Sequence, residues 1–428
     1  MPASETTPLL ANGHGGHHSF SQRIVALVKA EGEPSWLASL KWFIFGSWLN
    51  LLLVFIPLST LAHFLNWDAA LCFSFSFIAI VPLAKLLGEA TEQMSLKLGQ
   101  TLAGLLNATF GNAVEIIVGI SALLQGQIQI VQTSLLGSIL SNLLLVLGCS
   151  FLAGGIYHSE STFQVTAAQA SASLMTLACI TMIIPAAYHS ARTSLISVPS
   201  NPTEVITLVS DPLLSNLDEK GQAGLLIISR GTALLLLGVY VAYLFFQLKT
   251  HADLFVALPA RDEEGQIIPE EEETPKMSIF SAAVSLLTVT VITSFVADFL
   301  VASIEETAER YHIPKPFIGL ILLPIVANAA EHVTSVWMAM KNKMELTIGI
   351  CVGSSIQIAA FVVPLLVIIG WISGHELSLF FANFETVVFF VSVMLVNLLI
   401  QDGRSNYMEG VMLITLYLVI ALAFWVSD

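Results

Sequence analysis

The feature that most constrains the fold is a series of eleven long apolar stretches. About 20 apolar residues in a helix cross the hydrocarbon core of a bilayer, and lipid leaves no alternative partners for backbone polar groups. The stretches are continuous rather than alternating, which excludes a transmembrane β-barrel. The sequence predicts an all-α integral membrane protein with eleven transmembrane helices, at about 41–62, 68–88, 102–124, 131–156, 166–188, 223–247, 278–302, 316–339, 347–372, 384–401 and 408–426.

Composition agrees with this prediction. Only 11% of the 428 residues are charged, against about 25% in soluble domains. The net charge of −15 argues against nucleic-acid binding. The four cysteines lie in predicted spans without a C-x-x-C pair, and we interpret them as packing residues: Cys72, Cys149, Cys179 and Cys351.

Lysine and arginine are divided unevenly between the two predicted sides of the membrane. Because cytosolic loops are enriched in these residues, we expect residues 1–40 to be a cytosolic tail. An odd number of spans then places Asp428 on the lumenal or exterior side. The tail lacks the apolar core of a cleavable signal peptide.

Two features of this tail have alternative interpretations. The segment from Glu5 to Leu9 and Leu10 resembles an acidic dileucine signal, which a sorting adaptor would bind, but such a short pattern also arises by chance. Three histidines among glycines could sense metal, although flexible histidines more often bind nothing specific: His14, His17 and His18.

Two polar motifs recur at a fixed spacing. Asn112 and Glu115 in the third span are matched by Asn328 and Glu331 in the eighth, each 216 residues later. A common spacing indicates an internal repeat. The same spacing relates Gly137-Ser138 to Gly353-Ser354, Glu89 to Glu305 and Thr91 to Thr307.

The number of crossings predicts how the repeats are related. The third and eighth spans are five crossings apart, so they run in opposite directions, as in transporters with inverted repeats. We therefore expect 68–248 and 278–428 to be inverted five-helix repeats. The span at 41–62 is then an extra helix, and 249–277 is an acidic cytosolic loop.

The glutamates indicate a cation site. A carboxylate in the hydrocarbon core costs roughly 2.5–3.5 kcal/mol on insertion scales and usually marks an ion or proton pathway. Calcium takes six to eight oxygen ligands, and Mn²⁺ is an alternative because it also accepts oxygen. Carboxylates, amides and hydroxyls recur on one face of each of these helices, and they predict the transport site: Glu115, Glu331, Asn112, Asn328, Ser138, Ser354 and Gln357.

The same glutamates can carry protons. Burial favours a neutral carboxyl group, and two neighbouring carboxylates repel each other once the metal leaves. Cation and protons would then occupy the site in turn, which allows exchange without ATP.

These residues resemble the cation/proton exchanger family of the Ca²⁺/cation antiporter superfamily, and most of all the fungal vacuolar Ca²⁺/H⁺ exchangers. The resemblance rests on the glutamate motifs, the two Gly-Ser pairs, the stretch 82–92 and the acidic loop. It implies that cytosolic Ca²⁺ moves across the vacuolar membrane into an acidic lumen in exchange for H⁺. Its central carboxylates are Glu115 and Glu331.

Other classes fit less well. A sodium-coupled calcium exchanger is the nearest competitor, but such relatives carry further acidic groups on the helices after the motifs, where the fourth and ninth spans have none. A channel could use a ring of glutamates, yet inverted repeats favour alternating access. The motifs of intramembrane hydrolases are absent from the sequence. We therefore expect a transporter that is not an enzyme and has no cofactor beyond the transported Ca²⁺ or Mn²⁺.

Several further residues are candidates for supporting roles. His332 is a candidate for proton relay or gating, or is a structural histidine, and Asp298 is an intramembrane carboxylate. A first acidic group lines the vestibules or solvates helix ends: Glu89, Glu92, Glu305, Glu306 and Glu309. A second forms a regulatory metal site or a solvated linker: Asp262, Glu263, Glu264, Glu270, Glu271, Glu272 and Glu273.

Overall fold

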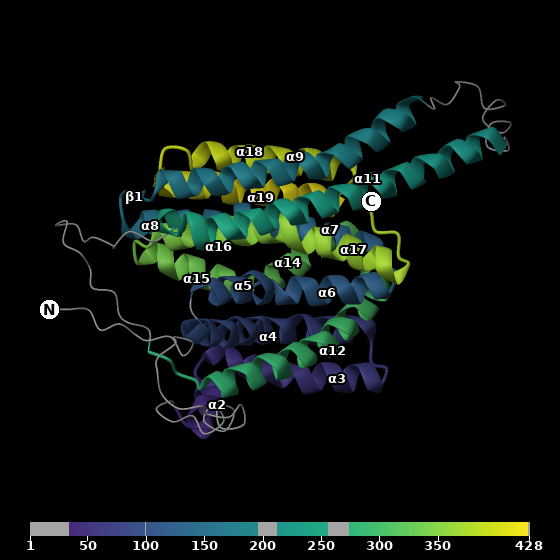
Figure 1. Cartoon of the computed structure of the whole chain (residues 1–428). Coiled ribbons are helices and arrows are strands. Elements are labelled where there is room, and N and C mark those ends of the chain that lie inside the picture. Colours follow the sequence, from purple (N-terminus) through teal and green to yellow (C-terminus); the bar gives the residue numbers. More distant parts are fainter. Residues whose placement is uncertain (1–33, 99, 196–211, 256–273, 427–428) are drawn as a thin grey trace, which may run out of the picture.

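The protein folds into a bundle of long helices that lie side by side (Figure 1). This computed structural model describes residues 34–98, 100–195, 212–255 and 274–426. Two short strands, β1 (Ser161–Thr162) and β2 (Arg404–Ser405), pair antiparallel. Every other element in the described residues is helical.

The first half of the chain contains α2 (Trp36–Phe45), η1 (Trp48–Val54), α3 (Phe55–Phe64), α4 (Ala69–Leu98), α5 (Gln100–Phe110), α6 (Ala113–Leu124), α7 (Ile128–Leu140), η2 (Ser141–Val146), α8 (Leu147–Tyr157), α9 (Val165–Leu195), α11 (Pro212–Phe245), η3 (Phe246–Thr250) and η4 (Ala252–Phe255). The second half contains α12 (Ile279–Tyr311), α13 (Lys315–Phe317), η5 (Ile318–Leu322), α14 (Leu323–Ala327), α15 (Ala329–Met340), α16 (Met344–Gln357), η6 (Ile358–Val362), α17 (Val363–Ser373), α18 (Asn383–Leu399) and α19 (Tyr407–Val426).

The helices are long and apolar enough for a membrane protein. Among the described residues, seven helices could cross a bilayer, or up to ten if each bent pair is one span. The helix α18 is apolar but has only 17 residues. The predicted all-α membrane fold is therefore confirmed, while the count of eleven spans stays a prediction.

The first predicted span differs from the expectation of one helix over 41–62. The chain there forms two helical pieces, Trp36–Phe45 and Trp48–Phe64, bent by 85°. Asn50 explains the bend, because its Nδ2 donates hydrogen bonds to the carbonyl oxygens of Phe43 and Ile44, each over 2.9 Å. These bonds satisfy carbonyls near the end of α2, so the apolar run need not continue as one helix.

Helix boundaries repeat at the spacing seen in the sequence. The helix α6 (Ala113–Leu124) has its counterpart 216 residues later in α15 (Ala329–Met340). The continuous helical segment Ile128–Tyr157 likewise corresponds to Met344–Ser373. In the view of Figure 1 the chain passes from left to right through α5 and α6, and from right to left through α14 and α15.

Glycine permits a close crossing at the centre of the bundle. A Cβ atom on Gly137 of α7 would lie 2.2 Å from the carbonyl oxygen of Leu320 and 2.6 Å from Cγ of Pro324. On the facing segment, a Cβ atom on Gly319 would lie 1.9 Å from Oγ1 of Thr133. The absence of side chains here lets α7 pack directly against η5 and α14.

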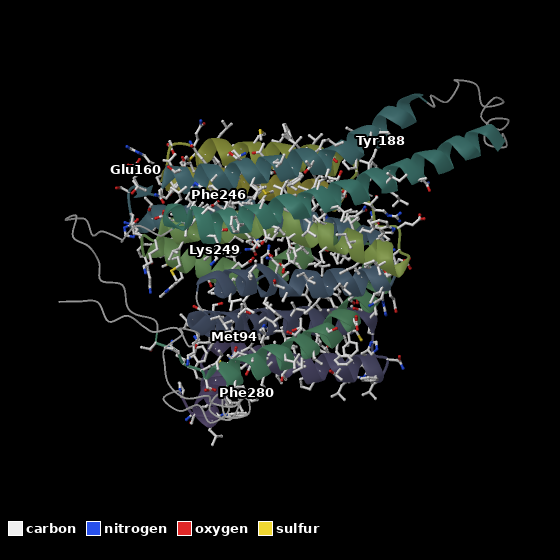
Figure 2. All side chains as sticks on the ribbon, viewed as in Figure 1. Met94, Glu160, Tyr188, Phe246, Lys249 and Phe280 are labelled. Carbon is white, nitrogen blue, oxygen red and sulfur yellow. The ribbon has the colours of Figure 1, made fainter. Side chains whose placement is uncertain are left out.

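The bundle has two ends, which we name after labelled residues. Glu160, Lys249, Met94 and Phe280 lie toward one end in Figure 2, and Tyr188 lies toward the other. We call these the Glu160 end and the Tyr188 end. The helices α2, α3, α4 and α12 pack together along one side of the bundle.

Candidate cation-binding site

Each glutamate motif lies where a helix is interrupted. Asn112 separates α5 from α6, which are bent by 43°, and Asn328 separates α14 from α15 with a bend of 58°. Glu115 and Glu331 consequently fall in the first turns of α6 and α15. The positive end of a helix dipole favours negative charge, which offsets part of the cost of burying each carboxylate.

The first motif is held by a helix from the other half of the chain. Ser354 Oγ donates to Oδ1 of Asn112 over 3.1 Å, and Asn112 Nδ2 donates to Oε1 of Gln357 over 2.5 Å. Asn112 is fully buried, so these bonds fix its orientation. The structure thereby brings together three of the residues that the sequence predicted.

The second motif is held by α7 and η2, which belong to the first half of the chain. Asn328 Nδ2 donates to the backbone carbonyl of Ser138 over 3.1 Å. Asn142 Nδ2 donates to Oε2 of Glu331 over 3.2 Å and to Ser354 Oγ over 3.0 Å. The two halves therefore share one hydrogen-bonded network, which runs from Gln357 through Asn112, Ser354 and Asn142 to Glu331.

Asn142 is a residue that the predicted site did not include. It is fully buried and belongs to η2, which continues α7 as a π-helix. Its spacing of four residues from Ser138 places both on one helical face. This spacing is the sequence feature that could have identified Asn142 as a site residue. A π-helical turn often marks a functional site, but none was expected here.

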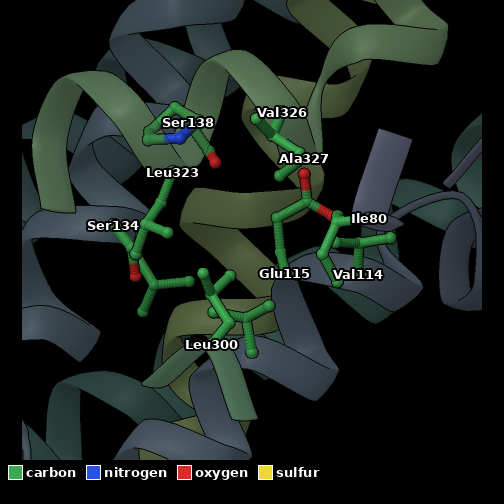
Figure 3. Close-up of a pocket in the computed structure, with 12 residues that line it drawn as sticks. Ile80, Val114, Glu115, Ser134, Ser138, Leu300, Leu323, Val326 and Ala327 are labelled. Atoms are coloured by element: carbon green, nitrogen blue, oxygen red, sulfur yellow. The ribbon is translucent and has the colours of Figure 1, made fainter. Parts of the chain in front are cut away.

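Glu115 lies in a small hollow near the centre of the bundle. Its side chain is 7% exposed, and it lines the hollow together with Ser134, Ser138 and Pro324. Figure 3 shows its carboxyl group beside Ile80 and Ala327. Glu115 and Glu331 are close enough for their charges to interact.

Two buried amide oxygens near the carboxylates have unused acceptor capacity. In the part of the chain that the structure describes, Oδ1 of Asn142 and Oδ1 of Asn328 are buried without a hydrogen-bond partner. Buried polar atoms are normally paired, so these oxygens need another explanation. A hard cation, which takes carboxylate, amide and hydroxyl oxygens, would satisfy them.

The acidic residues predicted for the vestibules fall into two groups. Glu89 and Glu92 lie on α4 toward the Glu160 end, and Glu305, Glu306 and Glu309 lie on α12 toward the Tyr188 end. Two of them are paired with lysine: Glu89 with Lys85 over 2.5 Å, and Glu305 with Lys315 over 2.6 Å. Their role in attracting cations stays a prediction.

His332 and Asp298 lie on different helices. His332 is half-buried and follows Glu331 in α15. Asp298 lies on α12, where its Oδ1 accepts a hydrogen bond from Ser121 Oγ of α6 over 2.6 Å. A proton relay through His332 stays a prediction.

Three predicted features lie outside the described residues. They are the dileucine segment with Glu5, the tail histidines from His14 to His18, and the acidic cluster from Asp262 to Glu273. Within the described residues, no group of three or more histidine, cysteine, aspartate or glutamate side chains could hold a metal ion. A cation at the centre would therefore depend on two carboxylates and neutral oxygens.

The sequence and the fold match known exchangers. Residues 68–249 and 281–426 match the family model of sodium/calcium exchanger proteins. A vacuolar calcium ion transporter of Schizosaccharomyces pombe is 42% identical over 98% of this chain and 93% of its own length. Vacuolar cation/proton exchanger 2 of Oryza sativa subsp. japonica is 40% identical over 91% of this chain and 84% of its own length.

Solved structures agree with this relationship. The Ca²⁺/H⁺ antiporter YfkE is 31% identical and superimposes with a TM-score of 0.68, covering 89% of this chain and all of that one. An H⁺/Ca²⁺ exchanger named CAX, at 13% identity and a TM-score of 0.62 over 87% of each chain, shares the fold. The resemblance to vacuolar cation/proton exchangers is confirmed, and the chain belongs to the sodium/calcium exchanger protein family.

Proposed function

We propose that this protein is a secondary active antiporter that moves cytosolic Ca²⁺ into an acidic vacuole in exchange for H⁺. The observation that carries the proposal is the shared network, in which buried amide and hydroxyl groups join Glu331 to Asn112 of the other motif, with Glu115 close enough for its charge to interact with that of Glu331. The names of the relatives from Schizosaccharomyces pombe and Oryza sativa support calcium, protons and a vacuolar membrane. The N-terminus is cytosolic in this proposal.

The charges suit a divalent cation. Glu115 and Glu331 neutralise one Ca²⁺, and the unused oxygens of Asn142 and Asn328 supply neutral ligands. An ion with two positive charges and only one carboxylate would leave a buried charge uncompensated, which costs several kcal/mol. Both carboxylates are therefore needed for tight binding of the ion.

Protons occupy the same carboxyl groups when the cation leaves. Two neighbouring carboxylates repel each other in a medium of low dielectric constant, and protonation removes this repulsion. Ca²⁺ and H⁺ then compete for one site. The site does not change sides while it is empty and carries both negative charges. This competition couples the downhill movement of protons to the uphill movement of Ca²⁺.

In our proposal, an inverted repeat allows the central site to open to each side of the membrane in turn. The repeats are 68–248 and 278–428, which with the bent first segment make eleven crossings. The matching helix boundaries and the opposite chain directions of α5–α6 and α14–α15 support this arrangement. The side formed by α2, α3, α4 and α12 would move against the closely packed centre around Gly137.

Transport in sealed vesicles tests the proposal. Purified protein in proteoliposomes should accumulate ⁴⁵Ca²⁺ when a pH gradient is imposed and should not respond to a Na⁺ gradient. Uptake driven by Na⁺ alone would identify a sodium-coupled exchanger instead. Competition with Mn²⁺ in the same vesicles tests whether Mn²⁺ is a main substrate.

A further inference from the structure

A second and larger hollow opens at the Glu160 end of the bundle. It lies between α5, the start of α9, the η3–η4 segment and the start of α16, and it encloses about 1180 Å³ together with the space at its mouth. Figure 2 shows Phe246 and Lys249 of η3 toward this end. The polar members of its lining are Asn107, Gln164, Ser171, Gln247 and Glu345.

The lining chemistry suits a hydrated cation. One carboxylate, three side-chain amides and one hydroxyl face the hollow, and its lining contains no lysine or arginine. A divalent ion with six waters needs about 200 Å³, at roughly 30 Å³ per water, so the hollow is large enough to hold one.

The helices α5 and α16 extend from the hollow toward the central site. Asn107 precedes Asn112 by five residues on α5, and Gly349 precedes Ser354 by five residues on α16. At 1.5 Å per residue, both positions are about 7.5 Å along the helix axis from the network. An ion in the hollow would therefore be one short step from Asn112 and Ser354.

The two equivalent positions toward the Tyr188 end are closely packed. Shifting by 216 residues takes Gly349 to Thr133 and Asn107 to Leu323. Thr133 Oγ1 would lie only 1.9 Å from a Cβ atom on Gly319, and Leu323 is buried in the core. The counterparts of Gly349 and Asn107 therefore do not line a hollow of this kind.

We propose that this hollow is the entry vestibule for hydrated divalent cations, and that Glu345 attracts them toward the central site. The inference rests on the proposed function, since it identifies the Glu160 end as the cytosolic entrance. Glu345 lies in the first turn of α16, outside the ninth span that the sequence predicted. It acts by raising the local concentration of cations rather than by binding the ion at the centre.

Cysteine labelling tests whether the hollow is open and selects cations. A Cβ atom on Gly349 would meet no neighbouring atom within 4 Å, so Gly349→Cys fits without strain. Gly238 on α11 is equally open but lies among exposed apolar side chains such as Leu235 and Val239, so Gly238→Cys is the matched control. The native cysteines are first replaced by serine or alanine: Cys72, Cys149, Cys179 and Cys351.

The protein is reconstituted in nanodiscs and treated with membrane-impermeant thiosulfonates that carry either a positive or a negative charge. We expect Gly349→Cys to react about tenfold faster with the cationic reagent, and Ca²⁺ to slow this reaction. Gly238→Cys should react with neither of the two thiosulfonates. Equal rates with both reagents or no protection by Ca²⁺ would refute a cation vestibule, and no reaction at Gly349→Cys would favour a lipid-filled groove.

The charge of Glu345 is tested by transport. Glu345→Gln should raise the half-saturating Ca²⁺ concentration several-fold, and less so at high ionic strength because salt screens the attraction. Glu376 is an exposed carboxylate in the loop before α18, and Glu376→Gln should leave the half-saturating Ca²⁺ concentration unchanged. An unchanged half-saturating concentration in Glu345→Gln would refute the attracting role.

The labelling experiment also separates this inference from the proposed function. Glu115→Gln should block Ca²⁺ uptake but leave the rate of labelling at Gly349→Cys unchanged when Ca²⁺ is absent. Loss of labelling would count against the vestibule, whereas pH-driven uptake by Glu115→Gln would count against the central site. In sealed vesicles, reaction from the lumenal side alone would overturn the cytosolic position of the entrance.

Discussion

The two glutamate motifs have nearly the same sequence but different surroundings. Glu331 is half-buried and accepts a hydrogen bond from Asn142. Glu115 is 7% exposed, beside apolar side chains, and receives no side-chain hydrogen bond from the described residues. The reason lies in the repeat, since the position that matches Asn142 is Ile358. A symmetric pair of motifs therefore produces an asymmetric site.

This difference has a physical meaning for exchange. A carboxylate that is tied to an amide keeps its orientation when the cation leaves, whereas one among apolar groups can turn. We infer that Glu331 holds the geometry of the site and that Glu115 is the more adaptable ligand. The following changes test this comparison, beginning with the largest effect.

Removing either charge should abolish exchange. Glu115→Gln and Glu331→Gln each keep the side-chain volume but leave one carboxylate for a divalent ion. The uncompensated charge costs several kcal/mol, which corresponds to a loss of about a hundredfold or more in affinity. ⁴⁵Ca²⁺ uptake driven by a pH gradient measures this, with size-exclusion chromatography to verify folding. Ordinary uptake by either well-folded variant would mean that the ion binds elsewhere.

Matched glycines in the two halves should respond differently to alanine. The methyl group in Gly137→Ala would meet the backbone of Leu320 at 2.2 Å, whereas at Gly353, its counterpart, nothing lies within 4 Å. We expect Gly137→Ala to destabilise the protein by about 1–3 kcal/mol and Gly353→Ala to leave stability intact. Thermal unfolding in detergent compares the two variants. Equal melting temperatures would show that α7 does not depend on this close crossing.

Loosening Glu331 should weaken binding without preventing it. Asn142→Ala removes two hydrogen bonds, each worth about 0.5–1.5 kcal/mol, so the half-saturating Ca²⁺ concentration should rise roughly tenfold. Ser150→Ala is the control, because within the described residues the Ser150 hydroxyl donates to the carbonyl of Val146, one turn earlier in the same continuous helical segment. If the two variants bound Ca²⁺ alike, Asn142 would have no role in holding Glu331.

An exposed ion pair far from the site should matter least. Arg404 and Glu160 approach to 3.3 Å with side chains 61% and 49% exposed. Such pairs contribute about 0–1 kcal/mol, so Arg404→Ala should change neither the melting temperature nor uptake appreciably. A marked loss of transport would show that the β1–β2 contact between the two halves has a larger role.

The sequence by itself determined the membrane character and the repeated motifs, and it predicts the central residues. Apolar length specifies a spanning helix through local chemistry alone, and a glutamate in the hydrocarbon core usually marks a functional site. The shared spacing of 216 between Glu115 and Glu331 required no knowledge of packing. The residues around these two glutamates could therefore be predicted from their spacing and type.

Only the tertiary structure decided which polar groups meet. Asn112 and Gln357 are 245 positions apart, and no periodicity specifies that they bond or that Asn142 reaches Glu331. The bend of 85° in the first segment and the hollow beside Gly349 likewise depend on contacts between distant helices. The physical reason is that lipid exposure constrains each helix separately, whereas hydrogen-bond partners are fixed by how the two halves pack together.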